Sequence, residues 1–348
     1  MTPQFVCLFR ASAVQYPGVI PMNHSAKAWL MAFTMGILLP GFLFSVSENF
    51  ISPVKESPKT PETLAVTEPT REQQVQQQSA EQVLVLMPEG ETELNMQDYL
   101  TGVLLAEMPV DFDMEALKAQ AVVSRTYALR RNTAGKKHPQ NAVCTESSCC
   151  QAYRSINDFL SKGGTEEMLA KVSQAVISTK DQVLTYDGDL IEATYFSCSG
   201  GRTEDAVAVW GTDIPYLQAV DSPGEEGAAH FVDTAEFTCD EFAALLGISP
   251  TEITVGTVTY TDGGGVATIV IDGKQLSGIE VRQKLGLRST AFSMYASGGV
   301  IYVSTKGFGH RVGMSQYGAE AMAIRGSDYQ EILYHYYPGT QLTVYTRN

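Results

Sequence analysis

The chain has 348 residues, of which 44% are hydrophobic and 18% are charged, so it can bury a substantial core. That size indicates one large globular domain or two smaller ones. The formal charge is −15, from 24 Lys and Arg against 39 Asp and Glu, and the sequence contains no cluster of basic residues. Nucleic acid and anionic lipid are therefore excluded as principal partners, because phosphate binding needs clustered cations.

The first element in chain order is an uncharged stretch at residues 28–46, dominated by Leu, Phe, Met, Ile and Ala. As a helix rising about 1.5 Å per residue it would about span a bilayer core, so we predict a transmembrane anchor. Arg10 and Lys27 precede it, which favours a cytoplasmic location for residues 1–27 and an extracytoplasmic one for the remainder. A cleaved signal peptide is the competing interpretation, but the apolar stretch is long, starts late and lacks a small-x-small cleavage site.

Residues 47–82 are rich in Pro, Thr, Glu, Gln and Ser, including a Gln-rich run at 73–78. Such a composition cannot bury enough apolar surface to fold, so we predict a disordered linker. It would act as a tether that lets the folded region, residues 83–348, move on the order of tens of ångströms from the membrane.

From residue 83 onward helical and strand patterns alternate, which predicts an α+β fold with a mixed helix and strand main domain. Helices are expected at 96–106, 114–131, 166–178, 239–246 and 318–323. Strands are expected at 183–186, 193–197, 253–261, 266–271 and 300–304. A hairpin that turns at 262–265, followed by a short helix at 278–285, indicates a smaller β-rich inserted domain at about 221–304.

Glu107 lies in the apolar run Leu104-Leu105-Ala106-Glu107-Met108-Pro109. An apolar setting disfavours the charged carboxylate, raises its pKa and suits a general acid near neutral pH. Taken alone, such a glutamate is more often a helix-surface residue or the partner of a lysine. The helix that follows carries Lys118, Gln120 and Arg125 on or beside a face of small residues, so we expect these polar groups to line a cleft.

Four side chains of metal-binding type fall within thirteen residues: His138, Cys144, Cys149 and Cys150. Thiolates and an imidazole in that number suit tetrahedral zinc, whereas an oxidising compartment would favour a disulfide between Cys144 and one of the adjacent pair. We predict a structural zinc ion, because four protein ligands leave no open position for a catalytic water. Cys198 and Cys239 are a further candidate pair.

Two glycine-containing runs, at 196–204 and 307–318, are too polar to be simple turns, and neither has the Gly-Lys-Ser/Thr of a phosphate-binding loop. Together with the motifs described above, these two runs make the chain resemble the stage II sporulation protein D (SpoIID) family from about Leu94 to Pro338. The resemblance rests on blocks in order along the sequence: Tyr99 to Val103, Glu107-Met108-Pro109, Glu115 to Ala121, Ser124 to Tyr127, Cys198 to Gly201, Val209-Trp210-Gly211, Pro215-Tyr216-Leu217, Gly309-His310 and Gly313 to Gly318.

The resemblance implies a peptidoglycan lytic transglycosylase that cleaves the bond between N-acetylmuramic acid (MurNAc) and N-acetylglucosamine (GlcNAc) in glycan without stem peptides. It implies that Glu107 alone protonates the leaving oxygen and then deprotonates the muramoyl C6 hydroxyl, closing a 1,6-anhydro ring, where ordinary glycosidases use two carboxylates. It also implies substrate contacts for eight residues: Lys118, Gln120, Arg125, Tyr195, Ser197, His310, Gln316 and Tyr317. Trp210 and Tyr216 could stack on sugars, although a buried anchor is the commoner role for such aromatic residues.

Two positions depart from the family pattern, since Phe308 and Arg311 stand where the family usually has tryptophan and glycine. Because of these two differences, the resemblance does not define the sugar contacts near His310. His310 itself equally fits a structural histidine between loops.

The family setting implies septal wall remodelling during sporulation and engulfment, from the mother-cell membrane facing the septal space. A SpoIIP-type amidase that strips the glycan and a SpoIIM-type membrane protein are the implied partners. Two alternatives stay open. One is a non-cleaving peptidoglycan-binding scaffold that recruits an amidase, and the other is a zinc-dependent hydrolase, although the sequence has no His-Glu-x-x-His motif.

Overall fold

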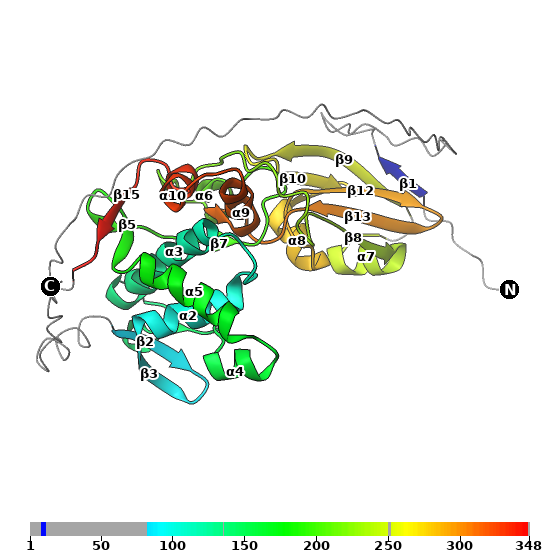
Figure 1. Ribbon diagram of the computed structural model, residues 1–348. Coiled ribbons are helices and arrows are strands. Elements are labelled where there is room, and N and C mark those ends of the chain that lie inside the picture. Colours follow the sequence, from blue (N-terminus) through cyan, green and yellow to red (C-terminus); the bar gives the residue numbers. More distant parts are fainter. Residues whose placement is uncertain (1–7, 12–81, 135, 250–251, 347–348) are drawn as a thin grey trace, which may run out of the picture.

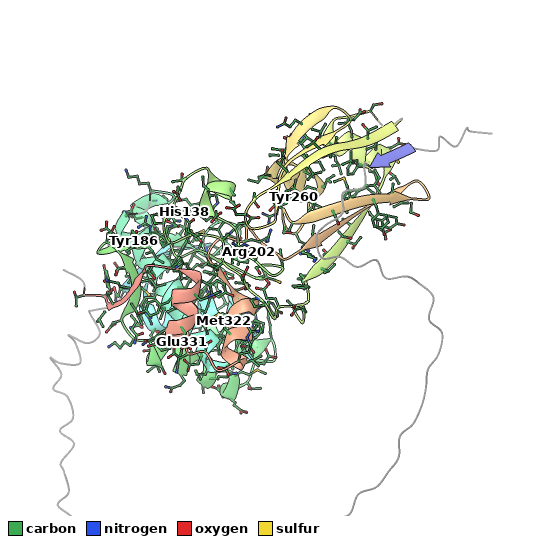
Figure 2. The ribbon with its side chains drawn as sticks, turned by 90° about the horizontal axis from the view of Figure 1, so that it is seen from above. His138, Tyr186, Arg202, Tyr260, Met322 and Glu331 are labelled. Carbon is green, nitrogen blue, oxygen red and sulfur yellow. The ribbon has the colours of Figure 1, made fainter. Side chains whose placement is uncertain are left out.

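The computed structural model describes residues 8–11, 82–134, 136–249 and 252–346, which form two lobes side by side (Figure 1). The main lobe comprises residues 82–231 and 307–346, and the inserted lobe comprises residues 232–306. Figure 2 shows the same division from above, with His138 in the main lobe, Tyr260 in the inserted lobe and Arg202 where they meet. Helices and strands are mixed throughout, which confirms the predicted α+β class.

Two long helices form the centre of the main lobe, α2 (Met96–Glu107) and α3 (Met114–Ala134). Asn95 begins α2 by accepting a hydrogen bond from the backbone N–H of Gln97, which satisfies one of the free donors of the first turn. Small buried residues on α3 let neighbouring helices approach closely; they are Ala116, Ala119, Ala121 and Ala128. Helices α5 (Glu166–Ser178), α9 (Gln316–Ile324) and α10 (Tyr329–Tyr336) pack against it.

Shorter elements surround this centre. The remaining helices of the main lobe are α4 (Ile156–Ser161), α6 (Ala206–Trp210) and the single turn η1 (Pro139–Asn141). Three small sheets have the strand orders β3-β2-β4, β15-β5-β6 and β14-β7. Their strands are β2 (Gln82–Met87), β3 (Gly90–Asn95), β4 (Val143–Cys144), β5 (Gln182–Tyr186), β6 (Asp189–Leu190), β7 (Tyr195–Phe196), β14 (Met314–Ser315) and β15 (Gln341–Val344). Because β7 and β14 pair in parallel, the two glycine-containing runs meet at one place.

The inserted lobe has its own hydrophobic core, to which two helices and two sheets contribute. The helices are α7 (Cys239–Leu246) and α8 (Gly278–Leu285). The strands are β8 (Val232–Thr238), β9 (Glu252–Tyr260), β10 (Val266–Ile271), β11 (Lys274–Ser277), β12 (Phe292–Ser297) and β13 (Val300–Lys306). Phe242 and Leu246 of α7 and Val281 of α8 pack with Ile269 and Ile301 of the sheets, so this lobe buries apolar surface independently of the main lobe.

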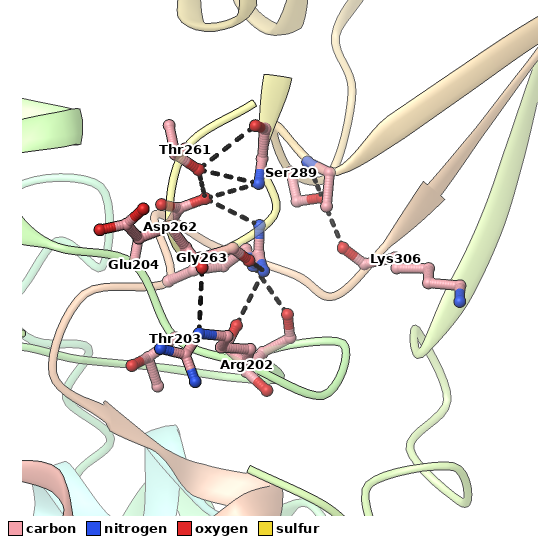
Figure 3. Close-up of polar contacts among 12 residues, drawn as sticks. Arg202, Thr203, Glu204, Thr261, Asp262, Gly263, Ser289 and Lys306 are labelled. Carbon is pink, nitrogen blue, oxygen red and sulfur yellow. Dashed lines mark hydrogen bonds and ion pairs between the residues drawn. The ribbon is translucent and has the colours of Figure 1, made fainter. Parts of the chain in front are cut away.

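A buried ion pair between Arg311 and Glu204, both of the main lobe, lies at the junction with the inserted lobe, and the two side chains are 3% and 1% exposed. Figure 3 shows Glu204 beside Thr261 and Gly263 of the inserted lobe. Arg311 Nη1 donates to Glu204 Oε1 at 3.1 Å, and its Nη2 donates to the carbonyl of Gly263 in the β9–β10 turn at 2.7 Å. The same Glu204 oxygen accepts from the N–H of Gly265 and the hydroxyl of Thr261, each at 2.9 Å. A buried charge is tolerated only when paired and hydrogen-bonded, so this network fixes the turn of the inserted lobe on the main lobe.

The predicted anchor at 28–46 lies outside the described residues, as does the predicted linker except for its last residue. Gln82 begins β2, so the linker ends earlier than predicted. Within the ranges that the structure describes, no helix is long and apolar enough to cross a membrane. A four-residue strand, β1 (Leu8–Ala11), pairs in parallel with β9.

Candidate active site

Glu107 is the last residue of α2, and its carboxyl group is largely shielded from water. Its Oε1 accepts a hydrogen bond from the backbone N–H of Ala152 at 2.5 Å. Burial raises the pKa of Glu107, while hydrogen bonding from Ala152, Tyr195 and Gln316 partly offsets that effect. The amide nitrogen of Gln316, although buried beside the carboxyl, makes no hydrogen bond of standard geometry. Burial therefore shifts the carboxyl group toward its protonated form, the form in which a general acid acts.

The β7–β14 pair brings the other predicted groups to this carboxyl. Tyr195 lies in β7, and Gln316 is the first residue of α9, directly after β14. The Ser197 carbonyl accepts from the N–H of Tyr317 at 3.0 Å, which ties the end of β7 to α9. The Tyr317 ring packs edge-on against Phe112, with centroids 5.1 Å apart. Tyr195, Ser197, Gln316 and Tyr317 thus form one region with Glu107.

Residues Cys150–Arg154, called the strap below, run back along α2 and hold Glu107 in place. In addition to the Ala152 bond, the N–H of Arg154 donates to the carbonyl of Gly102 at 3.0 Å. The Tyr153 ring stacks on Tyr99 at a centroid distance of 6.0 Å and occupies the space above Gly102. The strap was not predicted, because its key donor is a backbone N–H 45 residues from Glu107 and carries no side-chain signature.

A buried polar network lies behind the carboxyl. Gln151 is 1% exposed, and its side chain contacts the hydroxyl groups of both Tyr99 and Tyr195. Gln120 is fully buried and donates to the Ser124 hydroxyl at 3.0 Å, while its amide oxygen has no partner among the described residues. The predicted residue Gln120 therefore reaches the site through Ser124, and sequence reasoning missed Gln151 and Tyr99. The only sequence signal for Gln151 was a polar side chain directly after Cys150.

Two predicted substrate contacts are used elsewhere. Arg125 is 3% exposed, and its guanidinium donates to the carbonyls of Val176 at the end of α5 and Gln182 in β5, at 3.3 and 3.2 Å. Burial lowers its pKa to about 10, which leaves it charged at neutral pH. Lys118 pairs with Glu115 at 2.6 Å, beside α10. Two of the Arg125 donors thus cap a helix end and the start of β5, and its predicted contact with substrate stays a prediction.

His310 is held by the backbone. Its Nδ1 accepts from the N–H of Val312 at 3.1 Å, and its ring also hydrogen-bonds to the backbone of Tyr195. Burial lowers the pKa of His310 to about 4, with a further contribution from the positive charge of Arg282 in the inserted lobe. A neutral histidine in this position supports the strand that carries Tyr195. The neighbouring Trp210 is 42% exposed, with its ring 5.5 Å from that of His310.

The predicted metal ligands come together. The ligand atoms of His138, Cys144, Cys149 and Cys150, called the Cys/His cluster below, lie within 4.8 Å of one another. Nε2 of the histidine is 3.3 Å from one sulfur and 3.5 Å from another, close to the separation of about 3.5 Å between ligands of a tetrahedral zinc ion. All three thiols are free. The donor set and spacing therefore fit zinc held by four protein ligands.

The predicted pairing of Cys198 with Cys239 is wrong, because Cys198 is a buried free thiol. Its sulfur donates to the buried carboxylate of Glu225 at 3.2 Å. The same carboxylate oxygen accepts from the N–H groups of Ser199 and Gly200 at 2.8 and 2.9 Å. Glu225 thus fixes the Cys198 to Gly201 turn, which explains the unusual polarity of that run.

Comparison with known proteins agrees with this architecture. The family model described as Stage II sporulation protein (SpoIID) matches residues 90–186, which include Glu107, the Cys/His cluster and the strap. Stage II sporulation protein D of Bacillus amyloliquefaciens is 41% identical over 255 residues, covering 71% of this chain and 74% of that protein. This chain belongs to the SpoIID family. Its counterpart in Bacillus subtilis (strain 168) is also 41% identical, over 254 residues and with the same coverage of both chains.

A more distant relative of this SpoIID family member has a different name. The amidase enhancer of Bacillus subtilis (strain 168) is 29% identical over 302 residues. The match covers 71% of this chain and 40% of that protein.

Proposed function

We propose that this SpoIID family member is a membrane-anchored lytic transglycosylase, which cleaves the MurNAc–GlcNAc bond of peptidoglycan glycan without stem peptides. The observation that best supports this function is the largely shielded carboxyl of Glu107, whose pKa is raised by burial and which is held by the backbone of the strap. A raised pKa suits a carboxyl group that donates a proton and then takes one back.

The chemistry needs only this one carboxyl group. Glu107 donates its proton to the glycosidic oxygen as the C1–O bond breaks. The resulting carboxylate then removes the proton of the C6 hydroxyl, and O6 closes on C1 to give a 1,6-anhydro ring. No water is consumed, and Glu107 ends the cycle protonated.

The groups that act on Glu107 agree with this scheme. Among the described residues they are a backbone N–H, the hydroxyl of Tyr195 and the amide of Gln316, and none is a carboxylate. Glycosidases that admit water need a second carboxylate as base or nucleophile. Gln316 and Tyr195 are placed to donate hydrogen bonds to the carboxylate form after proton transfer, which would stabilise its charge.

The Cys/His cluster would hold a structural zinc ion in this proposal. Zinc there would cross-link the segment that leads into the strap, and it would supply no open coordination position for substrate. Its contribution would be to the position of Ala152 and hence of Glu107.

The setting follows from the family. The N-terminal anchor would hold the enzyme on the mother-cell membrane facing the septal space, where sporulation and engulfment remodel the wall. A SpoIIP-type amidase would supply stripped glycan, and a SpoIIM-type membrane protein would be a further partner.

Replacement of the acid tests the function. Glu107→Gln removes the titrating proton with little change of shape, so it should abolish the release of anhydro-muramoyl products from stem-free glycan, measured by mass spectrometry. Glu91→Gln, the same exchange at an exposed position of β3, is the matched control and should be fully active. Reaction in heavy-oxygen water should leave the products unlabelled. Label in the product, or full activity of Glu107→Gln, would refute the proposal.

A scaffold is the second candidate, favoured by the similarity to a protein named amidase enhancer. In that case the chain would bind glycan and stimulate an amidase without cutting. Glu107→Gln separates the two, because a scaffold would keep its full effect on a purified amidase while the wild-type protein released no anhydro products.

A further inference from the structure

The side chain of Gln151 is fixed in one orientation. Its Nε2 donates to the hydroxyl of Tyr99 at 3.0 Å and to the backbone carbonyl of Ser124 at 3.3 Å. A backbone carbonyl can only accept, so the nitrogen of the amide must face Ser124. The amide oxygen must then face Tyr195, whose hydroxyl donates to it at 3.2 Å.

The hydroxyl group of Tyr195 has a second possible acceptor. It also lies within hydrogen-bonding reach of Glu107. Because the phenol has a single proton, it can donate either to Gln151 or to Glu107, but not fully to both. A protonated carboxyl group is the weaker acceptor, whereas an ionised carboxylate is the stronger one.

We propose that Gln151 is a positioning residue of the acid/base site. While Glu107 is protonated, the Tyr195 hydroxyl donates its hydrogen bond to the amide oxygen of Gln151. Once the acid has acted, the same hydroxyl donates to the Glu107 carboxylate instead. This inference rests on the proposed function of Glu107 and adds a group that does not touch substrate.

The surroundings leave this role to Gln151. In the part of the chain that the structure describes, the titratable groups that interact with Glu107 are Tyr99 of its own helix and Tyr195 of β7, and burial raises the pKa of each well above its ordinary value. Both are neutral in the working range. Gln316 of α9 carries no charge, and the strap contributes a backbone N–H. The direction of the Tyr195 hydroxyl is then the variable that changes how easily Glu107 ionises.

Removal of the acceptor tests the proposal. In Gln151→Met the Tyr195 hydroxyl can donate only to Glu107, which stabilises the carboxylate, so Glu107 should ionise about one pH unit lower than in the wild type. We would measure this in the full chain by NMR, with labelled glutamate carboxyl groups and the Glu107 signal assigned by its loss in Glu107→Gln. The alkaline limb of the plot of kcat/KM against pH should move to lower pH by the same amount.

Two further variants test the direction in which the titration midpoint of Glu107 moves. Gln151→Glu keeps an oxygen that accepts from Tyr195 and adds negative charge nearby, so the Glu107 midpoint should lie at or above the wild-type value. Gln174→Met makes the same exchange as Gln151→Met at an exposed position of α5 and should change neither midpoint nor rate. A lowered midpoint in Gln151→Met together with a midpoint that is not lowered in Gln151→Glu is not expected from loss of packing alone.

A wild-type midpoint in folded Gln151→Met, or a lowered one in Gln151→Glu, would overturn the proposal. If Gln151→Met does not fold, Tyr195→Phe tests the proposal instead. Removal of the hydroxyl should raise the titration midpoint of Glu107, and an unchanged midpoint would contradict the proposed change of acceptor. The NMR midpoint does not depend on turnover. Anhydro products from Glu107→Gln would therefore refute the function alone, while an unmoved midpoint would refute only the role of Gln151.

Discussion

Gly102→Ala is the sharpest test of how the strap positions Glu107. A Cβ at this position of α2 would lie 2.3 Å from Cε2 of Tyr153 and 2.8 Å from the carbonyl oxygen of Arg154. Ordinary contacts between carbon atoms are about 3.5–4.0 Å, so the strap must retreat by more than about 1 Å. The second contact is with backbone, and a turn of the Tyr153 ring alone cannot relieve it.

That displacement has a calculable effect on the site. The hydrogen bond from Ala152 to Glu107 is 2.5 Å long, and a shift of about 1 Å takes it to the limit of useful hydrogen bonds. Misplacement of a catalytic group by about 1 Å can cost about 100-fold in rate, and overpacking costs about 1–3 kcal/mol of stability. Since the Ala152 bond lowers the pKa of Glu107, its loss should raise that pKa further and extend the alkaline limb of the rate profile to higher pH.

The assay combines product release from stem-free glycan with thermal melting. Gly227→Ala is the matched control, because a Cβ there meets nothing within 4 Å and the backbone is not left-handed. It should keep wild-type rate and melting temperature. Full activity of Gly102→Ala, with an unchanged alkaline limb, would show that the strap does not position the acid.

Three other predictions follow from the same contacts. The pKa of Glu107 is higher in the folded protein than in the unfolded chain, so the stability that this group gives is present below its unfolded pKa and is lost as pH rises through the folded pKa. Urea unfolding should therefore find Glu107→Gln more stable than the wild type at high pH. In acid the two proteins should not differ in this way. Glu204→Gln should cost about 3–5 kcal/mol because it leaves a buried guanidinium uncompensated, whereas Asp221→Asn, in an exposed pair, should cost less than about 1 kcal/mol in the same denaturant titration. Elemental analysis should find one zinc per chain, and chelation should lower both melting temperature and activity; a metal-free active protein would contradict the zinc site.

Local patterns in the sequence predicted much of the fold. The helices at 166–178, 239–246 and 278–285 have the predicted bounds, and each begins at a threonine or serine that accepts a hydrogen bond from the first turn. The strand predicted at 193–197 shortens to two residues, because β7 pairs only with the equally short β14. The hairpin of β2 and β3 was missed, since its outward positions are charged and its first residue reads as linker.

The site was predictable only in part, for reasons that differ by residue. Apolar neighbours in the sequence marked Glu107, and burial did raise its pKa. The contact of Arg125 with α5 could not be predicted, because helical periodicity shows which residues share a face but not what packs on that face. Gln151 needed the path of the strap, which depends on contacts between residues about fifty positions apart.

The position of the Cys/His cluster changes how metal dependence should be interpreted. The strap begins at the last cysteine of the cluster, and Ala152, two residues on, holds Glu107. Loss of an ion from the cluster would therefore loosen the donor to Glu107 without removing any group that touches the glycan. Sensitivity to a chelator would ordinarily suggest a metal hydrolase, but the proposed transglycosylase, whose acid is positioned through the strap, predicts it as well. The two are told apart by the product, because a metal-activated water leaves its oxygen on the sugar and ring closure by O6 does not.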